Sequence, residues 1–191
     1  MIVGRPDANR LPQHHEKPER LHLGCGEDHR PEWLNVDANP DVEPDVVADL
    51  EEEWEFAPDN SVEVIEARQV VEHLEDRAGF FAEAARVLRP GGVLRISVPL
   101  GVNADTDSDH EAPNWTYRTP EQFSRPHRRS WDPDIPLELI NRSVDVWLGG
   151  PLSAASPLLR LAAHKWPAWA AYRCYAGILT AEYRRMEVND E

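Results

Sequence analysis

The sequence predicts one α/β domain built on a mostly parallel, doubly wound β-sheet. Three observations lead to this class. Short apolar segments predicted as strands recur from residue 20 to residue 98, separated by helices or by loops of helix length. The chain of 191 residues suits one hydrophobic core and is short for two ordinary domains. The first predicted strand ends in a glycine turn, and the next two end in acidic residues.

The first half of the chain carries the clearer periodicity. Apolar and β-branched segments predict strands at residues 20–23, 33–37, 45–49, 61–67 and 93–98. A helix is predicted over residues 76–88, because Phe80, Ala84 and Val87 fall on one face. The run Arg89-Pro90-Gly91-Gly92 then ends that helix.

The two ends of the chain are predicted from weaker signals. Residues 1–18 are predicted to form a flexible N-terminal arm, because three prolines interrupt a polar run without periodicity. Residues 101–136 are predicted to be rich in loops. A helix is predicted over 152–166, ending at Trp166-Pro167, and a closing strand over 178–188.

The composition is strongly acidic. Thirty-five acidic residues face 20 basic ones, the formal net charge is −15, and only two residues are lysine. Such a charge repels nucleic acid, so no DNA partner is expected, although a local patch could still bind RNA. High acid content with almost no lysine is typical of proteins kept hydrated in concentrated salt, which predicts a halophilic source.

Several other classes of protein are not expected. No run approaches the roughly 18–20 apolar residues of a membrane-spanning helix, and the N-terminus lacks the apolar core of a secretory signal. A cytoplasmic protein is therefore expected. Cys25 and Cys174 are the only cysteines, which argues against a disulfide framework and against zinc ligation, and no metal cofactor is expected.

The glycine turn lies in the stretch LHLGCGED at residues 21–28. Gly24 and Gly26 let the backbone approach a ligand at the carboxyl end of the first strand. A dinucleotide-binding turn needs a third glycine where this chain has His29, and a phosphate-binding Walker loop needs a lysine that is missing. The turn therefore predicts a nucleotide-like ligand without a pyrophosphate.

Acids at the next two strand ends point to adenosine. Asp37 ends the second predicted strand, where a carboxylate can accept hydrogen bonds from both hydroxyls of a ribose. Asp49 ends the third, where it can accept one from an adenine amino group. An acidic lining also favours a ligand that carries positive charge.

These motifs, with those that follow them, resemble the class I S-adenosylmethionine-dependent methyltransferases, particularly the branch often called type 11. The matching segments cover about 80 residues in the family's order and spacing: LHLGCG at 21–26, LNVDANP at 34–40, VVADLEEEWEFAPDNSVEVIEARQVVEHL at 46–74, and FFAEAARVLRPGGVLRISVP at 80–99. The resemblance implies a Rossmann-like sheet and S-adenosyl-L-methionine as the cofactor. The short span from Gly26 to Asp37 implies a reduced first helix.

The resemblance also assigns roles to individual residues. The methionine and ribose part of the cofactor would lie against the glycine turn, the ribose hydroxyls on the acid of the second strand, and adenine beside the third strand's end. The end of the fourth strand would line the cofactor as well. The residues concerned are Gly24, Cys25 and Gly26, then Asp37, then Asp49 and Leu50, then Gln69, Val70 and His73. His22 stands where the family usually has an acid or asparagine that contacts the methionine amino group.

A looser match places His110 over the methyl donor. Residues 107–123, DSDHEAPNWTYRTPEQF, are similar to a segment of the same branch. Histidine suits the removal of a proton from a hydroxyl acceptor near neutral pH, so His110 is the candidate catalytic base. A loop histidine without a partner remains the alternative. For His73, the alternative to cofactor contact is a buried core histidine.

Two charged clusters remain open to two interpretations. The acids around His110, from Asp105 to Glu111, could bind a divalent metal or form a solvated loop. Arg125, His127, Arg128 and Arg129 could clamp an anionic acceptor or balance nearby acids. Tryptophans in the last third of the chain could stack on an acceptor, rest on a membrane surface or pack in a core.

The sequence therefore predicts a methyltransferase domain over residues 19–191, with residues 19–100 holding the cofactor and 101–191 shaping the acceptor side. The expected acceptor is an oxygen of a small molecule or glycan, while a protein or RNA acceptor stays open. The alternative is a non-catalytic module of the same fold that binds the cofactor or acts as a scaffold.

Overall fold

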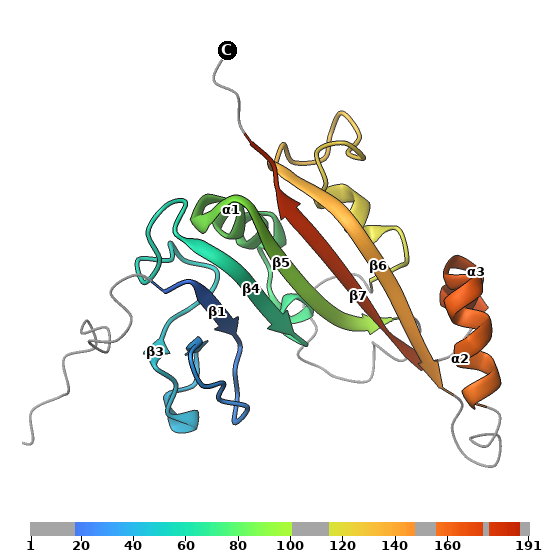
Figure 1. Ribbon diagram of the computed structural model, residues 1–191, viewed down its shortest axis with the longest axis horizontal. Helices are drawn as coiled ribbons and strands as arrows, with labels where there is room; N and C mark the ends of the chain where they lie inside the picture. Colours follow the sequence, from blue (N-terminus) through green and yellow to red (C-terminus); the bar gives the residue numbers. More distant parts are fainter. Residues whose placement is uncertain (1–17, 101–114, 148–155, 174–175, 188–191) are drawn as a thin grey trace, which may run out of the picture.

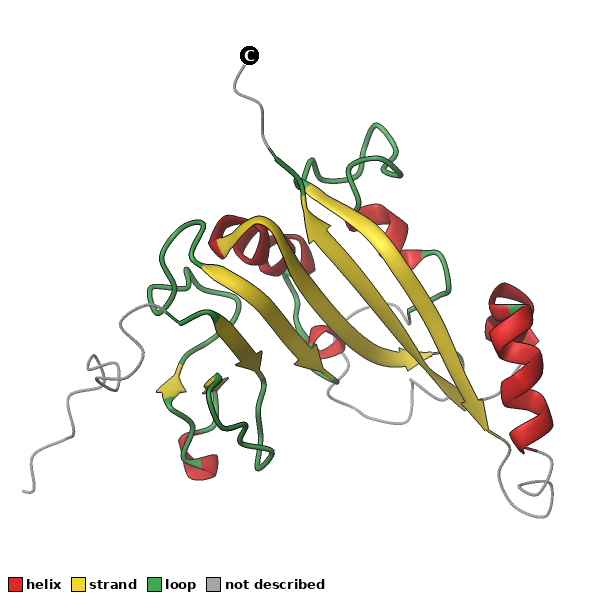
Figure 2. Ribbon diagram, viewed as in Figure 1, coloured by secondary structure: helices red, strands yellow, loops and turns green. Residues whose placement is uncertain are grey.

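The computed structural model describes residues 18–100, 115–147, 156–173 and 176–187. One seven-stranded sheet runs through both halves of the chain in the order β3-β2-β1-β4-β5-β7-β6 (Figures 1 and 2). The predicted α/β class with a mostly parallel sheet is confirmed. The strands are β1 (Arg20–Leu23), β2 (Leu34–Asp37), β3 (Val46–Val47), β4 (Val62–Arg68), β5 (Leu88–Leu100), β6 (Leu137–Trp147) and β7 (Ala176–Arg185).

The strand directions bring several strand ends to one edge of the sheet. β1 pairs in parallel with β2 and β4, and the pairs β2–β3 and β4–β5 are parallel too. β7 alone is reversed, since it is antiparallel to both β5 and β6. The carboxyl ends of all strands except β7 therefore share one edge, called here the carboxyl edge. The strand order reverses between β1 and β4, which is where ligands bind in open α/β sheets.

One face of the sheet is apolar and covered. Helix α1 (Arg77–Val87) buries Phe80 and Phe81 against it, after Asp76 caps the helix by accepting a hydrogen bond from the Gly79 N–H at 2.8 Å. The 3-10 helix η4 (Thr119–Phe123) extends this cover, because Phe81 stacks on Phe123 at 4.0 Å between ring centroids. The buried core lies between these helices and the strands.

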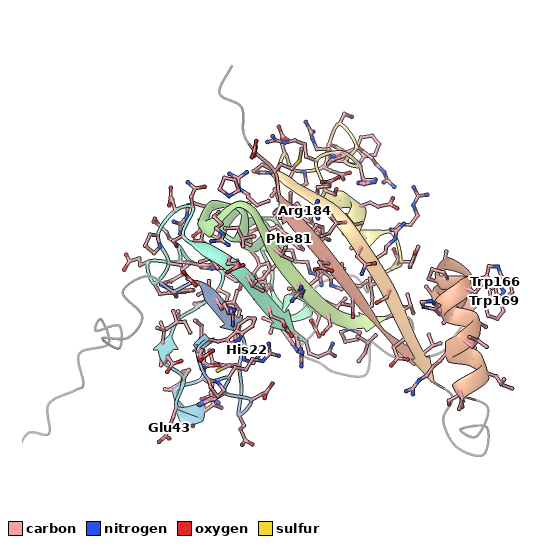
Figure 3. The ribbon with its side chains drawn as sticks, viewed as in Figure 1. His22, Glu43, Phe81, Trp166, Trp169 and Arg184 are labelled. Carbon is pink, nitrogen blue, oxygen red and sulfur yellow. The ribbon has the colours of Figure 1, made fainter. Side chains whose placement is uncertain are left out.

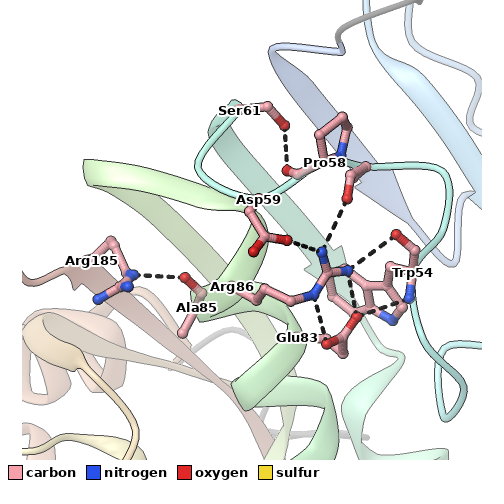
Figure 4. Close-up of polar contacts among 9 residues, drawn as sticks. Trp54, Pro58, Asp59, Ser61, Glu83, Ala85, Arg86 and Arg185 are labelled. Carbon is pink, nitrogen blue, oxygen red and sulfur yellow. Dashed lines mark hydrogen bonds and ion pairs between the residues drawn. The ribbon is translucent and has the colours of Figure 1, made fainter.

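Arg86 joins α1 to the turns that precede β4 (Figure 4). Its guanidinium donates to Glu83 Oε2 at 2.7 Å, to Asp59 Oδ1 at 2.5 Å and to the Trp54 carbonyl at 3.2 Å. Glu83 Oε2 also accepts from the Trp54 N–H at 2.8 Å. The hydrogen bond from Arg86 lowers the pKa of Glu83, so this carboxylate stays charged beside the core.

The opposite face is polar. One row of paired positions crosses six strands through Asn35, His22, Glu66, Arg95, Glu182 and Asn141. Arg95 bonds Glu182 at 3.1 Å, and its side chain is half-exposed. Within the described ranges, residues 24–33 and 48–61 contain turns but no helix. In a doubly wound sheet, helices cover both faces, whereas these turns cover the second face only in part. The turns at 24–33 also confirm the prediction of a reduced first helix.

The second half of the chain holds two elements that the sequence did not predict. β6 was missed because a bulge between Leu139 and Asn141 breaks its alternation. Helix α2 (Ser156–Lys165) corresponds to the helix predicted at 152–166. Helix α3 (Pro167–Arg173) was not predicted, because Pro167 begins this helix as well as ending the one before it. β5 begins at Leu88 rather than at residue 93, because the chain passes from α1 directly into the strand.

The other element predictions match within a few residues. The strand predicted at 178–188 is β7 at Ala176–Arg185, and the helix predicted at 76–88 is α1. Of the predicted arm at 1–18, residues 1–17 lie outside the described residues. No helix in the described part of the chain has the length and apolar character to cross a membrane.

Candidate binding site at the carboxyl edge of the sheet

The glycine turn after β1 needs both of its glycines, for different reasons. Gly24 and Gly26 have φ values of +61° and +50°, a region that residues with side chains rarely adopt. A Cβ on Gly24 would lie 2.2 Å from Val70 Cγ2, so this glycine lets the end of β4 pack against the turn. A Cβ on Gly26 would meet nothing within 4 Å, so Gly26 faces open space.

Asp37 is tied to that turn. Its Oδ2 accepts a hydrogen bond from the Gly26 N–H at 2.8 Å, and its Oδ1 accepts one from the Asn39 N–H at 2.9 Å. Both carboxylate oxygens are thereby fixed in place, and each keeps lone pairs for further donors. The side chain is only half-buried. Asp37 can therefore accept two hydroxyl hydrogen bonds from a diol, beside the open side of Gly26.

The residues after β3 reach the same edge. The Ala48 N–H donates to the Asp37 carbonyl at 3.1 Å, which holds the start of this segment beside β2. Asp49 is exposed, and its Oδ1 accepts from the Glu51 N–H at 3.0 Å. The Leu50 side chain is buried in the core, and the Leu50 carbonyl accepts a hydrogen bond from Trp54 Nε1 at 3.2 Å. The pair offers an acceptor group next to an apolar wall.

The end of β4 supplies a third side of the site. Gln69 is exposed and has a φ of +54°, although it is not a glycine, and its N–H donates to the Ser97 carbonyl at 2.8 Å. Non-glycine residues held in this conformation store strain and cluster at ligand sites. His73 lies on the 3-10 helix η2 (Val71–His73) and is exposed, so it is not a buried core histidine.

His22 belongs to a buried polar cluster beneath the turn. It is buried between Asn35 of β2 and Glu66 of β4, which are also buried (Figure 3 labels His22). Arg30 bridges the cluster, with its guanidinium on Glu66 at 3.0 Å and its N–H on Asn35 Oδ1 at 2.8 Å. Burial, and then the charge of Arg30, lower the pKa of His22. The imidazole is therefore neutral at neutral pH.

The sequence does not predict this cluster, because His22, Asn35 and Glu66 lie on three different strands. Asn35 additionally donates to Asp45 Oδ2 at 2.8 Å. Burial favours protonation of Glu66, but the hydrogen bond and charge of Arg30 outweigh it, and the net effect lowers its pKa. The one sign of the cluster in the sequence is that His22, Asn35 and Glu66 are polar residues inside predicted strands, where a parallel sheet normally has apolar residues.

Cys25 contributes backbone rather than thiol chemistry. Its side chain is buried, and burial raises the pKa of the thiol to about 11, so the thiol stays protonated and unreactive. The Cys25 N–H donates to the Val36 carbonyl at 3.1 Å, which fixes the turn on β2. In the part of the chain that the structure describes, no three His, Cys, Asp or Glu side chains gather as metal ligands.

Neither His110 nor the basic cluster predicted for the acceptor side is placed at the carboxyl edge by the described part of the structure. His110 and the acids around it lie outside the described residues. The basic cluster of residues 125–129 lies at the start of β6, opposite the carboxyl edge, where the Arg125 N–H donates to the Leu137 carbonyl at 2.8 Å. Asp134 accepts ion pairs from Arg125 at 2.8 Å and from Arg128 at 3.3 Å. This geometry favours local charge balance over an acceptor clamp at the site.

The sheet order and the glycine turn after β1 define a Rossmann-like fold of the class I type. A family model described as "Methyltransferase domain" matches residues 21–96, which run from β1 through β5 and contain the site. The match covers less than half of the chain, and it agrees with the resemblance to the class I S-adenosylmethionine-dependent methyltransferases that the sequence motifs carry.

Curated relatives match over a short segment. A probable S-adenosylmethionine-dependent methyltransferase of Mycolicibacterium smegmatis is 57% identical over 42 residues, which are 22% of this chain and 16% of that protein. One from Mycobacterium tuberculosis is 55% identical over 42 residues, which are 22% of this chain and 15% of that protein. The matches therefore span about a sixth of the relatives' own length.

Solved structures match over nearly the whole chain at low identity, which supports the fold. The complex of the Haloferax volcanii Trm112 methyltransferase activator with a methyltransferase gives a TM-score of 0.61 at 15% identity, covering 96% of this chain and 88% of that one. A sarcosine dimethylglycine methyltransferase from Galdieria sulphuraria gives 0.58 at 13% identity, covering 92% and 80%. A 16S rRNA adenine methyltransferase from Catenulisporales acidiphilia gives 0.54 at 14% identity, covering 98% and 95%.

Proposed function

We propose that this protein transfers a methyl group from S-adenosyl-L-methionine to an oxygen of a small-molecule or glycan-type acceptor. One observation carries the cofactor assignment. The carboxylate of Asp37 is fixed by the Gly26 and Asn39 N–H groups at 2.8 and 2.9 Å, next to the open side of Gly26. A preorganised carboxylate beside an open backbone turn suits a ribose diol.

The residues at the carboxyl edge fit the rest of this cofactor. We assign the methionine and ribose part to Gly24, Cys25 and Gly26, and the adenine to Asp49 and Leu50. Gln69 and His73 line the remaining side, from the end of β4. His22 is neutral and buried in the cluster beneath the turn, so it offers no charge to the methionine amino group. Residues 19–100 thus hold the cofactor.

Methyl transfer needs alignment and the loss of a proton. When bound, the cofactor supplies an electrophilic methyl group on a sulfonium. The fixed carboxylate and turn orient that group, and such alignment supplies much of the rate in an in-line displacement. We assign His110, in the acceptor-side half at 101–191, to take the proton from a hydroxyl acceptor. In this proposal, Gly26 and Asp37 only bind and orient the cofactor and take no part in proton transfer.

Composition supports a working environment of concentrated salt inside the cell. Acidic residues outnumber basic ones 35 to 20, and lysine occurs only at positions 17 and 165. The protein therefore has to be assayed in both low and high salt.

The test begins with binding and continues with transfer. Purified protein is expected to gain thermal stability from S-adenosylmethionine and from its demethylated product, and lack of any gain in either salt would contradict the cofactor assignment. Methyl-labelled donor is then supplied with fractionated host lysate. Label in a small molecule or glycan supports the proposed acceptor, whereas label in RNA or protein replaces it.

His110→Ala separates the enzyme from the non-catalytic alternative. Retained cofactor binding with lost transfer supports a base at this position. Unchanged transfer removes His110 from the mechanism. Binding without any transfer by the unmodified protein, across all lysate fractions, favours a module that binds the cofactor as a scaffold.

A further inference from the structure

Helices α2 and α3 bury small side chains and expose several large apolar ones, although Leu159 packs against the core. Ala163 and Ala170 are 1% and 0% exposed. Four large apolar residues on these helices and at the junction between them are more than half exposed: Leu158 at 74%, Leu161 at 69%, Trp166 at 56% and Trp169 at 51%. A helix that only covers a core turns its largest apolar side chains inward. The reversed pattern indicates a second contact on the outer side.

The exposed residues form one surface. Leu158, Leu161 and Lys165 are spaced by three and four residues, so they share a face of α2. Lys165 Nζ lies 4.9 Å from the centroid of the Trp166 ring. Figure 3 shows Trp166 and Trp169 together, on the side of α2 and α3 that faces away from the sheet. We call these five residues the tryptophan patch.

The patch lies in the longest acid-free segment of an acidic chain. No Asp or Glu occurs between Asp145 and Glu182, whereas Arg160, Lys165 and Arg173 do, and the chain as a whole carries −15. Arg160 pairs with Asp145 at 3.0 Å and so ties α2 to the end of β6. At low ionic strength, an anionic surface that meets repulsion from most of this protein meets none from the residues of this segment.

We propose that the tryptophan patch docks on an anionic lipid surface. Leucine and tryptophan side chains insert at the level of the headgroups, and the lysine beside them reaches the lipid phosphates. A symmetric contact between two copies is disfavoured, because it places the lysines of both patches together without an acid to neutralise them. β6 is parallel to β5 through β7, so α2 follows a strand that ends at the carboxyl edge.

Vesicle sedimentation tests this directly with the full chain. Vesicles of phosphatidylglycerol and phosphatidylcholine in equal parts are compared with vesicles of phosphatidylcholine alone. The protein is expected to sediment with the first and much less with the second. The double variant Trp166→Ala/Trp169→Ala should weaken sedimentation by about tenfold or more. Lys165→Gln should weaken only the preference for the anionic vesicles, by about fivefold.

Trp131→Ala is the matched control. Trp131 is 75% exposed and has Arg129 over its ring at 5.6 Å, but Asp132 follows it. This control should sediment like the unmodified protein, and circular dichroism melting checks that every variant folds. The proposal is overturned if the unmodified protein ignores anionic vesicles, or if Trp131→Ala weakens sedimentation as much as the double variant. It is also overturned if the patch instead holds a dimer that the double variant dissociates.

None of these measurements uses methyl transfer. Failure of vesicle binding leaves the proposed cofactor and acceptor untouched, and failure of methyl transfer leaves the docking result standing. The two proposals can therefore fail separately.

Discussion

The backbone N–H of Gly26 donates to Asp37 Oδ2 over 2.8 Å, which joins the turn after β1 to the end of β2. Asp37→Asn keeps the shape of this side chain but removes its charge and one of its two acceptor oxygens. Hydrogen bonds to a charged group contribute about 1.5–3 kcal/mol, so affinity for S-adenosylmethionine should fall by about tenfold to a hundredfold. Isothermal titration calorimetry measures this loss.

The control for Asp37→Asn is Asp41→Asn. Asp41 is an exposed acid of the 3-10 helix η1 (Pro40–Val42), four residues further along the chain. Its substitution removes the same charge and should leave affinity unchanged. Equal losses in both variants would mean that net negative charge attracts the cofactor, rather than the fixed carboxylate.

Gly24→Ala and Gly26→Ala should separate folding from binding. The added Cβ meets Val70 Cγ2 at 2.2 Å in the first case and nothing within 4 Å in the second. Gly24→Ala should therefore cost roughly 3 kcal/mol of stability from overpacking plus backbone strain, and Gly26→Ala only about 1–2 kcal/mol from strain. Urea unfolding gives these values, and Val70→Ala should recover part of the loss at position 24 alone.

Cofactor affinity then distinguishes the two glycines further. If the cofactor approaches the open side of Gly26, Gly26→Ala lowers affinity more than its mild effect on stability explains. Affinity that is unchanged in folded Gly26→Ala would move the cofactor away from this turn.

The buried imidazole of His22 predicts how stability depends on pH. Its folded pKa lies below the ordinary value of 6.5, so the unfolded chain takes up the proton first as pH falls. Stability should therefore decline as pH drops below about 6.5, until the folded pKa is reached. Glu66 acts in a lower window, below its ordinary 4.5, because its folded pKa is lowered as well.

His22→Gln should flatten the upper part of this pH dependence. Free energies of unfolding in urea, measured between about pH 5 and 7.5, test it. His164→Gln, which removes an exposed imidazole on α2, is the control and should keep the slope of the unmodified protein. A slope that survives in His22→Gln would assign the effect to another group.

The sequence predicted which residues lie together at the carboxyl edge better than it predicted the second half of the fold. Asp37, Gly24 and Gly26 were recognisable because a parallel sheet places the residues after successive strands on one edge, so sequence order alone locates them. β6 was not recognisable, since its bulge at Leu139 and Asn141 shifts the alternation that marks a strand. The polar cluster around His22 depends on pairing between strands, which no local pattern contains.

Arg86→Leu should destabilise the protein by about 2 kcal/mol, because one guanidinium holds Glu83, Asp59 and the Trp54 carbonyl. Without it, the half-buried Glu83 loses the hydrogen bond that lowers its pKa, and that pKa should rise. Arg89→Leu is the control, since Arg89 pairs with Glu63 at 3.1 Å with both side chains well exposed. Such a pair contributes under about 1 kcal/mol, so thermal unfolding should show a clear difference.

Gln69 supplies the last test, through its φ of +54° at the end of β4. Gln69→Gly should relieve strain and raise stability by about 1 kcal/mol. If the strained backbone is held for the cofactor, affinity should nevertheless fall several-fold, because glycine frees this backbone to leave the bound conformation. Glu43→Gly is the matched control, with a φ of +52° and an exposed side chain that is not among the residues assigned to the cofactor. It should gain similar stability with unchanged affinity, whereas equal affinities in both variants would make the strain at Gln69 a feature of the fold alone.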